Sequence, residues 1–448
     1  MSSHARPLLA LILLAAPLRA DTLKVPADFE TIQAAVDVAV AGDVVLVSKG
    51  TYVETVSVET SGITLKGKNA VINARYLGDC IAVDADDVSI SGFTLLYGGT
   101  GGLALTGDGD IEAGGLFYAG SGADIAKLVV RACDDYGIRL AGTGAIDKCD
   151  VRGCNGPGIQ VETPSFLSQI VTDVTRNEVR NCFGGFLLEN GPFAVEKNRA
   201  ESNYADGIVV SIPVPVLDGL PQVEASVVSG NTADNNDGDG FVLSDGASVG
   251  MLVDKNVSHA NGWGMVAAGL DHLITGNTLE DNTLGGLRLD TTSAEASGNK
   301  LRRNGQVGVL VGAFFSFADG SGDTGNNVVR DNRIEANGGD GVRVSSSGNV
   351  IDDNSLRDNL GDGVDIEQGN PDNQLLANQV TKNLHDGLDN SGDDTLFTDN
   401  ASSGNGGADL AGTGTLGAGT VSELSAGNVS GDGTDLGSGQ ELDLETID

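Results

Sequence analysis

Short apolar segments alternate with Gly and Asn along most of the chain. The repeating unit is clearest in Gly298–Val311 and Lys148–Val161, which align without a gap. Each segment contains Asn or Cys, four residues, a second Asn or Cys, three residues, Gly, and a triplet whose first and third residues are apolar. Such alternation has the two-residue period of a β-strand. The pattern therefore predicts short strands that are separated by turns.

The glycine of this unit returns about every 22 residues, which is too short for repeats built from paired helices. The frame of leucine-rich repeats is absent. One coil of short strands per repeat predicts an all-β, single-stranded parallel β-helix, a solenoid whose coils lie ~4.8 Å apart. Roughly sixteen coils between Val44 and Leu410 would give a rod ~75 Å long. The glycine is expected at Gly137, Gly158, Gly185, Gly207, Gly240, Gly264, Gly286, Gly308, Gly341, Gly363, Gly387 and Gly407.

The two Asn positions of the unit predict buried ladders. An Asn amide can donate a hydrogen bond to one neighbouring coil and accept one from the other, which satisfies buried turn groups. Asn also tolerates the left-handed backbone of tight turns. We interpret these residues as structural: Asn256, Asn261, Asn277, Asn282, Asn299, Asn304, Asn332, Asn337, Asn354, Asn359, Asn378 and Asn383.

The two ends of the chain depart from the repeat. Residues 1–20 have the features of an export signal, because the apolar run Leu8–Ala16 is followed by a small residue, Ala20, suited to cleavage. We therefore expect the mature protein outside the cytoplasm, secreted or periplasmic. Residues 44–410 are the predicted β-helix, and residues 411–448 are degenerate last coils and an acidic tail.

Residues 21–43 predict a capping segment with a short helix. Apolar residues recur at helical spacing within Asp28–Asp43, with Asp28 as the expected N-cap and Gly42 as the expected stop. The open end of a β-helix is an exposed strand edge that invites aggregation. A helix at this place would cover it.

The formal net charge of −37 restricts the partners. Such a surface repels nucleic acid and anionic lipid head groups, so we expect no nucleic-acid partner. It also repels a polyanionic glycan unless cations or a local basic patch intervene. A saline habitat and a Ca²⁺-related role both explain the acidity. No later apolar run is long enough for a membrane helix. We expect a monomer that binds a glycan or a surface protein.

The segment Thr31–Gly67 resembles the opening of many secreted proteins of the pectate-lyase-like fold group, which are right-handed parallel β-helices. The remaining repeats are similar to the generic parallel β-helix repeat of the NosD-like periplasmic family. This resemblance covers nearly the whole mature chain and implies a right-handed helix. It leaves the activity open, because the scaffold carries lyases, hydrolases, esterases, epimerases and non-enzymes.

No complete catalytic motif accompanies the resemblance. Gly50–Glu54, GTYVE, resembles one motif of pectin methylesterases, but the two Asp-bearing motifs and the Arg-Pro-Trp stretch of that family are not found. The GHG motif of polygalacturonases and the DPHD motif of alginate epimerases are absent too. We interpret Gly50–Glu54 as the first turn of the scaffold, with Glu54 on the surface.

Cysteine replaces asparagine in the early coils. Cys133, Cys154 and Cys182 fall on the second Asn position and Cys149 on the first, whereas Cys80 has no evident partner. Buried thiols, a Cys133–Cys154 disulfide between adjacent coils and a metal site are the three alternatives.

Three insertions share one corner of the repeat and could wall a groove: Thr163–Gln169, Ser211–Ala225 and Gly312–Asp323. The neighbouring strand face would present, outward, Arg139, Gln160, Leu187, Val209, Val242, Arg288, Leu310 and Arg343. The candidate ligand-binding residues, which include aromatic platforms for sugar rings, are Phe166, Arg288, Phe314, Phe315, Phe317 and Arg343. Alternatively, the loops fold back to cover the apolar residues of that face.

Charged residues on adjacent early coils are weak catalytic candidates: Arg131, Asp134, Asp135, Arg139 and Arg152. Eliminative cleavage of a polyuronate needs a cation beside the carboxylate and a base for the α-proton. A solvated charge ladder is the alternative. Asp234–Gly240 could bind Ca²⁺ through oxygen ligands or be an ordinary acidic turn. No other cofactor is indicated.

The sequence favours an exported scaffold that binds polysaccharide or a protein partner along one face. The alternative is a polysaccharide-active enzyme, a polyuronate lyase or a carbohydrate esterase, on the pectate-lyase-like fold. Because no catalytic motif is complete, the sequence does not decide whether the protein is an enzyme.

Overall fold

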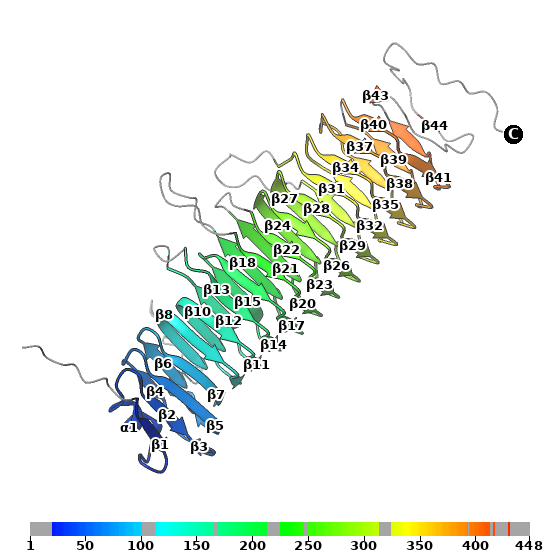
Figure 1. Cartoon of the computed structure of the whole chain (residues 1–448). Coiled ribbons are helices and arrows are strands. Elements are labelled where there is room, and N and C mark those ends of the chain that lie inside the picture. The colour runs from blue at the N-terminus through cyan, green and yellow to red at the C-terminus, as the bar shows by residue number, and fades with distance from the viewer. Residues whose placement is uncertain are drawn as a thin grey trace, which may run out of the picture.

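The computed structural model describes residues 20–100, 113–164, 169–212, 225–245, 250–312, 324–392, 394–412, 415–416 and 429–430. These residues form a rod of stacked coils that follows the order of the chain from one end to the other (Figure 1). The rod is a right-handed, all-β parallel solenoid of about 16 turns with almost no helix, which confirms the predicted β-helix. No described segment forms a helix that is long and apolar enough to cross a membrane.

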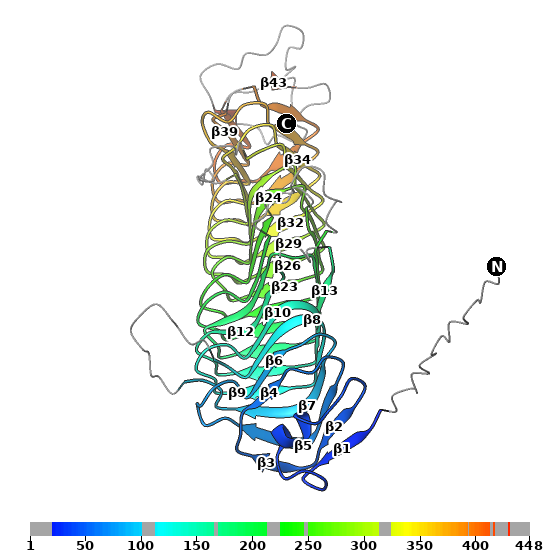
Figure 2. The same ribbon diagram turned by 90° about the vertical axis from the view of Figure 1, so that its left-hand side faces the viewer.

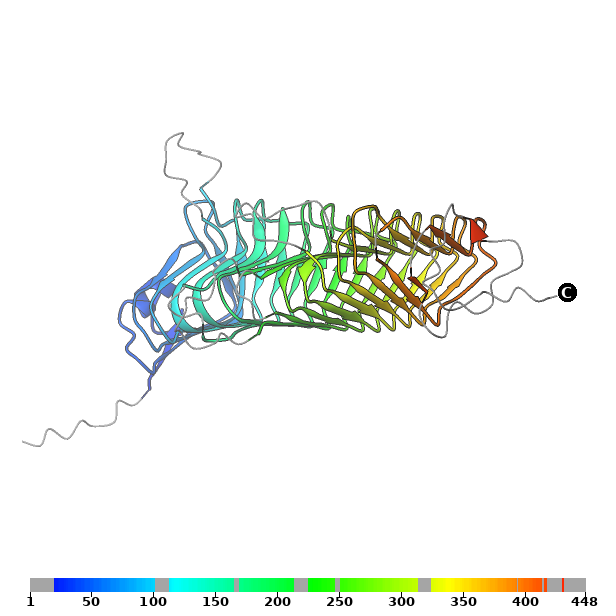
Figure 3. The same cartoon turned by 90° about the horizontal axis from the view of Figure 1, so that it is seen from above.

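The strands fall into three columns, in which each strand pairs in parallel with the equivalent strands of the neighbouring coils (Figures 2 and 3). Column I follows the repeat glycine and contains β4 (Val56–Val58), β6 (Ile81–Asp84), β8 (Leu116–Ala126), β10 (Ile138–Asp147), β12 (Pro157–Glu162), β15 (Gly184–Glu189), β18 (Ile208–Ile212), β21 (Phe241–Asp245), β24 (Met265–Leu270), β27 (Leu287–Thr292), β30 (Val309–Val311), β33 (Val342–Val344), β36 (Val364–Ile366), β39 (Leu388–Asn390), β42 (Leu410–Gly412) and β44 (Val429–Ser430).

Column II comes next in each coil and includes the second halves of β8 and β10. Its other strands are β1 (Thr22–Val25), β2 (Val44–Val47), β5 (Thr64–Asn73), β7 (Ser89–Leu96), β13 (Thr172–Thr175), β16 (Phe193–Glu196), β19 (Val227–Ser229), β22 (Leu252–Asp254), β25 (Leu273–Thr275), β28 (Glu295–Ser297), β31 (Val328–Arg330), β34 (Val350–Asp352), β37 (Gln374–Leu376), β40 (Leu396–Thr398) and β43 (Thr415–Leu416).

Column III completes each coil and includes the second halves of β5 and β7. Its other strands are β3 (Gly50–Tyr52), β9 (Val129–Arg131), β11 (Asp150–Arg152), β14 (Glu178–Arg180), β17 (Arg199–Glu201), β20 (Thr232–Asp234), β23 (Val257–His259), β26 (Thr278–Glu280), β29 (Lys300–Arg302), β32 (Arg333–Glu335), β35 (Ser355–Arg357), β38 (Gln379–Thr381) and β41 (Ala401–Ser403).

The repeat glycine allows neighbouring coils to approach closely. A Cβ atom added to Gly286 would lie 2.6 Å from the carbonyl oxygen of Gly308 in the next coil, so a larger residue would push the coils apart. The strand register aligns every predicted repeat glycine except the last. Leu388 pairs with Leu410, so Asp409, not Gly407, holds the glycine position in the last coil. The prediction followed the nearest glycine, whereas strand pairing sets the register.

Two ladders of buried asparagines run along the turns on either side of column III. In the ladder between columns II and III, Asn299 donates through Nδ2 to Asn332 Oδ1 (3.1 Å) and to the Ile274 carbonyl (2.9 Å). Its Oδ1 accepts from the backbone N–H of Asn277 (2.9 Å). Asn304 makes equivalent bonds in the ladder between columns III and I. The turn amides of one coil are thus satisfied by the side chains of the next.

A third ladder, which the repeat frame does not predict, runs along the turn between columns I and II. Asn327 N–H donates to Asn349 Oδ1 (3.0 Å), and Asn349 N–H donates to Asn373 Oδ1 (2.9 Å). All three residues are fully buried. In these three coils, side-chain amides therefore connect this turn between coils as they do the other two.

The N-terminal helix is α1 (Ile32–Val36), which is much shorter than the predicted segment. Its N-cap is Thr31, whose Oγ1 accepts from Ala34 N–H (3.2 Å). The prediction of Asp28 as N-cap is wrong, because that carboxylate accepts from Lys24 N–H instead (3.0 Å). The helix ends with Asp37 as C-cap, so Gly42 is not its stop either. The apolar spacing continues into turns, where it no longer marks a helical face.

Glu54 gives the GTYVE stretch a structural role. Its two carboxylate oxygens accept from the backbone N–H groups of Ile32 and Gln33, both at 3.1 Å. These N–H groups belong to the first turn of α1, which has no internal partners for them and favours a negative charge. Glu54 therefore anchors α1 and is not simply a surface residue.

Candidate functional site

The outward side chains of column I form a continuous surface, which we call face I. Strand register places Arg139 beside Gln160, Gln160 beside Leu187, and Leu187 beside Val209. Farther along the rod, Arg288 lies beside Leu310 and Leu310 beside Arg343. Val242, which lies beside Val209, belongs to the same row. These side chains alternate along each strand with buried residues and are themselves half-buried or exposed.

Arg139 is the centre of a cluster near the N-terminal end of face I. Its guanidinium carbon lies 6.0 Å from the centre of the Phe117 ring and 5.9 Å from that of Tyr136, within the range of cation–π attraction. Glu162 forms an ion pair with Arg139 at 3.7 Å. Tyr136 Oη donates to Asp79 Oδ1 (2.8 Å), and burial raises the pKa of both groups. The repeat pattern does not reveal Phe117, Tyr136 or Asp79 as members of this cluster, although Phe117 precedes Arg139 by one coil.

The other catalytic candidates do not meet at one point. Arg131 and Arg152 pair in register, so they share a repeat position, but they lie on column III and not on face I. Arg152 forms an ion pair with Asp150 on its own strand. Asp134 and Asp135 lie in the turn between columns III and I. The described arrangement fits a charge ladder better than a shared catalytic centre.

A row of carboxylates runs beside the asparagine ladder near the C-terminal end of face I. Asp340 Oδ1 accepts from the backbone N–H of Asp362 in the next coil (2.8 Å). Arg343 forms ion pairs with Asp340, with Asp365 (3.2 Å) and with Glu367 (3.9 Å). Burial first, and neighbouring carboxylates second, raise the pKa values of Asp362 and Asp365 to about 6. This end of the face is acidic, and its arginine is already paired.

The groove walled by the three predicted loops stays a prediction. Their aromatic residues lie outside the described residues: Phe166, Phe314, Phe315 and Phe317. The two predicted binding arginines are described, and both are engaged within the scaffold. Arg288 lies 2.7 Å from Asp290, which follows it on β27, and Arg343 has the partners given above.

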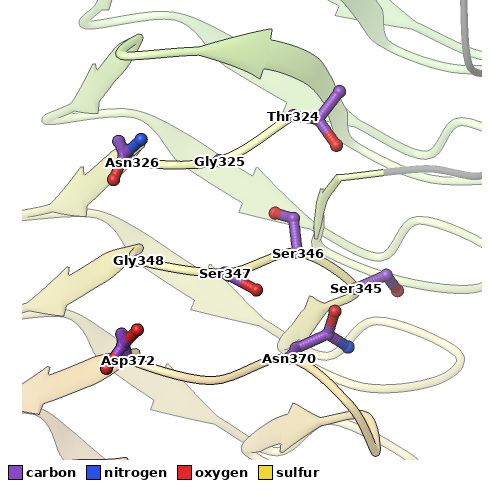
Figure 4. Close-up of a pocket in the computed structure, with 9 residues that line it drawn as sticks. All are labelled: Thr324, Gly325, Asn326, Ser345, Ser346, Ser347, Gly348, Asn370 and Asp372. Carbon is purple, nitrogen blue, oxygen red and sulfur yellow. The ribbon is translucent and has the colours of Figure 1, made fainter. Parts of the chain in front are cut away.

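A polar pocket opens where column I ends and column II begins (Figure 4). Its volume is about 470 Å³. We call it the turn pocket and define it by Thr324, Gly325, Asn326, Ser345, Ser346, Ser347, Gly348, Asn370 and Asp372. Ser345 follows β33 directly, so the pocket lies along the edge of face I. The repeat pattern does not reveal this pocket, because the three turns that build it have different sequences.

Several polar groups of the turn pocket are not used by the scaffold. The hydroxyls of Thr324 and Ser347, the Asn326 amide and the Asp372 carboxylate make no hydrogen bond with any part of the chain that the structure describes. Asn370 donates to the Glu367 carbonyl (2.9 Å) through Nδ2. The pocket therefore offers hydroxyl, amide and carboxylate groups to solvent or to a ligand.

Comparison with known families agrees with this architecture. The sequence profile described as "Right handed beta helix region" matches residues 114–270 and 252–406. The chain belongs to this right-handed β-helix family.

Solved structures similar to this β-helix include two epimerases and one surface adhesin. The periplasmic alginate epimerase AlgG is 14% identical, with 84% of this chain and 74% of that chain covered and a TM-score of 0.32. The A-module of the Azotobacter vinelandii mannuronan C-5 epimerase AlgE4 is 16% identical, with coverage of 90% and 95% and a TM-score of 0.31. PfbA, a surface adhesin of Streptococcus pneumoniae, is 12% identical, with coverage of 87% and 89% and a TM-score of 0.36. No curated protein matches the chain.

All five cysteines of this β-helix are buried free thiols. Cys133, Cys154 and Cys182 extend an asparagine ladder: Cys182 Sγ accepts from Cys154 N–H (3.5 Å), and Cys182 N–H donates to Asn203 Oδ1 (3.1 Å). Cys149 heads the other ladder, and burial raises its pKa to about 12. The Cys133–Cys154 disulfide is not present, because sulfur takes the place of the amide oxygen as an acceptor between coils.

Cys80 holds the glycine position of its coil, which its spacing did not reveal, and donates to the Leu96 carbonyl (3.3 Å).

In the calcium candidate Asp234–Gly240, Asn236 belongs to a buried ladder, and Asp239 accepts a hydrogen bond from a backbone N–H of the next coil (2.6 Å). Among the described residues, no group of three or more His, Cys, Asp or Glu side chains is placed to hold a metal ion. A calcium site in this β-helix stays a prediction.

Proposed function

We propose that the protein is an exported scaffold that binds an extended polysaccharide along face I. The observation that supports this most is the continuous row of half-buried and exposed side chains on face I, kept in register coil after coil. A surface that repeats along a solenoid suits a long ligand that also repeats. Aliphatic residues and the Phe117 ring offer contacts to the C–H faces of sugars, while Gln160 and Arg139 offer hydrogen bonds. The predicted export signal supports a site of action outside the cytoplasm.

We further infer that α1 closes the N-terminal end of the scaffold. It packs on β1, β2 and β4, and buries Ile32, Ala35 and Val36 against them. Covering the first coil would keep this edge from pairing with another chain.

The proposal is tested with immobilised linear oligosaccharides, both neutral and acidic, with and without Ca²⁺. We expect saturable binding to at least one glycan. Arg139→Ala should weaken it about tenfold, because the residue joins charge and aromatic contact on face I. Arg303→Ala is the matched control, since Arg303 pairs with Asp281 away from face I. If no glycan binds, the proposal fails, and a protein partner becomes the better candidate.

A polyuronate lyase is the second candidate, favoured by the Asp79–Tyr136–Arg139 cluster. Arg139 could face a sugar carboxylate, and Tyr136 could take the α-proton as its own proton passes to Asp79. The glycosidic C–O bond then breaks, and the leaving oxygen takes a proton from solvent. The burial of Tyr136, with 2% of its surface exposed, counts against this role. Ultraviolet absorbance of unsaturated products from pectate or alginate tests it. Product formation that disappears in Tyr136→Phe would replace the scaffold proposal with the enzyme.

A further inference from the structure

We propose that the turn pocket binds a neutral glycosyl unit and rejects a uronate. This inference rests on the glycan-binding function proposed above and names the class of sugar. It concerns the coils that contain β30, β33 and β36, far along the rod from the Arg139 cluster (Figure 1).

The lining of the pocket matches the chemistry of a sugar ring. Thr324 and Ser347 each offer a hydroxyl that can donate and accept, and Asn326 offers both amide functions. None of these three side chains has a hydrogen-bond partner in the part of the chain that the structure describes. A neutral pyranose carries several hydroxyls that both donate and accept. Such a ligand can satisfy all of the lining groups at once.

The walls of the pocket are held in place before any ligand arrives. Asn349 Nδ2 donates to the Ser346 hydroxyl (3.0 Å) and carbonyl (2.9 Å). Asn373 Nδ2 donates to the Asn370 carbonyl (2.8 Å). The backbone of Asn326 also donates to the Ser347 carbonyl in the next coil (3.1 Å). A preformed site loses little freedom on binding, which favours affinity for a small polar ligand.

Charge decides between neutral and acidic sugars. Among the described residues, the lining contains one ionisable side chain, the Asp372 carboxylate, and no cation. Glu367, which is not part of the lining, accepts from the hydroxyl of the lining residue Ser345 (2.8 Å). Arg343, the nearby cation of face I, is already paired with Asp340, Asp365 and Glu367. A uronate carboxylate would face like charge without a matching cation, whereas Asp372 can accept from the hydroxyls of a neutral sugar.

Size and position agree with one part of a longer chain. The pocket volume of about 470 Å³ lies within the range of small-molecule sites, roughly 300–1,000 Å³. Figure 4 shows Thr324, Ser345, Ser346 and Asn370 gathered on one side and Asn326 and Asp372 on the other. The rest of a bound glycan can therefore continue onto face I from this edge.

The test compares neutral hexaoses of glucose, xylose and mannose with hexagalacturonate and hexamannuronate by calorimetry. We expect wild-type protein to bind at least one neutral hexaose about tenfold more tightly than either acidic one. Thr324→Val/Ser347→Ala removes two hydroxyls with little change of shape and should weaken neutral binding about tenfold. The control variant Thr278→Val/Ser297→Ala makes the same changes at half-buried positions of β26 and β28. Its affinity for neutral hexaoses should stay within about twofold of that of the wild type.

A charge variant sharpens the test. Asp372→Asn should narrow the preference for neutral over acidic hexaoses, because it removes the negative charge that the described lining residues contribute. If glycan binding is strong but unchanged in Thr324→Val/Ser347→Ala, the pocket inference is overturned while the function of face I stands. A preference for an acidic hexaose would also overturn it. Binding to none of the hexaoses would overturn both.

Discussion

Asn373 and Asn370 lie three residues apart and have different roles. Asn373 is fully buried; its Oδ1 accepts from Asn349 N–H (2.9 Å), and its Nδ2 donates to the carbonyls of Ser346 (3.2 Å) and Asn370 (2.8 Å). Asn370 is half-buried in the wall of the turn pocket and uses only its Nδ2, toward Glu367. Inside the rod, the amide of Asn373 joins neighbouring coils. At the pocket, the Oδ1 of Asn370 is left to accept a hydrogen bond from another molecule.

The difference separates stability from binding. A buried polar group that loses its partner costs more than the bond it made, because water cannot replace that partner. An exposed polar group that is removed costs little, since water satisfied it before. Substitutions in the ladders should therefore change the free energy of unfolding, and substitutions in the turn pocket should change affinity.

The largest effect is expected from Asn299→Ala. This change leaves the buried N–H of Asn277 and the carbonyl of Ile274 without their side-chain partner. We expect the free energy of unfolding to fall by about 2–4 kcal/mol, from two unsatisfied buried groups. Urea unfolding followed by circular dichroism measures it.

Asn155→Ala is the control for this variant. Asn155 is exposed in the turn that follows Cys154, and its side chain makes no hydrogen bond with the described residues. Its loss should change the free energy of unfolding by less than about 0.5 kcal/mol. Equal losses in both variants would contradict the role assigned to the ladders.

A smaller effect is expected where a carboxylate accepts the hydrogen bond between coils. Asp362 accepts from Asp386 N–H (2.7 Å), and burial, with the charges of Asp340, Asp389 and Asp386, raises its pKa to about 6. In the unfolded chain the pKa is about 3.9. The folded protein thus holds the proton of Asp362 more tightly than the unfolded chain does. The stability gained from this tighter proton binding is complete below pH ~4 and is lost as the pH rises through about 6.

Asp362→Asn keeps the acceptor and removes the charge. We expect it to raise the free energy of unfolding at pH 7 by roughly 1 kcal/mol, a value reduced for partial solvent screening, and to give no gain below pH ~4. Urea unfolding at several pH values checks this, with Asp353→Asn on an exposed turn as control. A gain of the same size at both pH values would contradict the electrostatic explanation.

The repeat could be predicted from sequence because it is enforced in every coil. Each inward side chain and each ladder residue contacts its equivalent one repeat away, so one frame fixes the strands, the columns and nearly all glycine positions. It failed at Asp409, where the register comes from strand pairing. It also failed at α1, where apolar spacing alone could not separate five helical residues from the turns after them.

The turn pocket could not be predicted in this way. Its groups come from three turns whose sequences share only the buried Asn of the third ladder, preceded by Gly325-Asn326, Ser347-Gly348 and Pro371-Asp372. Nothing in the spacing shows that Thr324, Ser347 and Asp372 line the same space. The cluster around Arg139 was hidden for a similar reason, because Phe117 belongs to a coil in which the repeat frame is weak.

The smallest effect on stability is expected from Thr324→Val/Ser347→Ala. Neither hydroxyl bonds to the described part of the scaffold, so we expect the free energy of unfolding to change by less than about 0.5 kcal/mol. Thermal unfolding of the variant beside wild type measures this, in the same preparation used for calorimetry. A larger loss would mean that the hydroxyls support the turn, and a weaker affinity could then be a consequence of a distorted pocket. Unchanged stability with about tenfold weaker neutral-sugar binding would separate the ligand site from the ladders behind it.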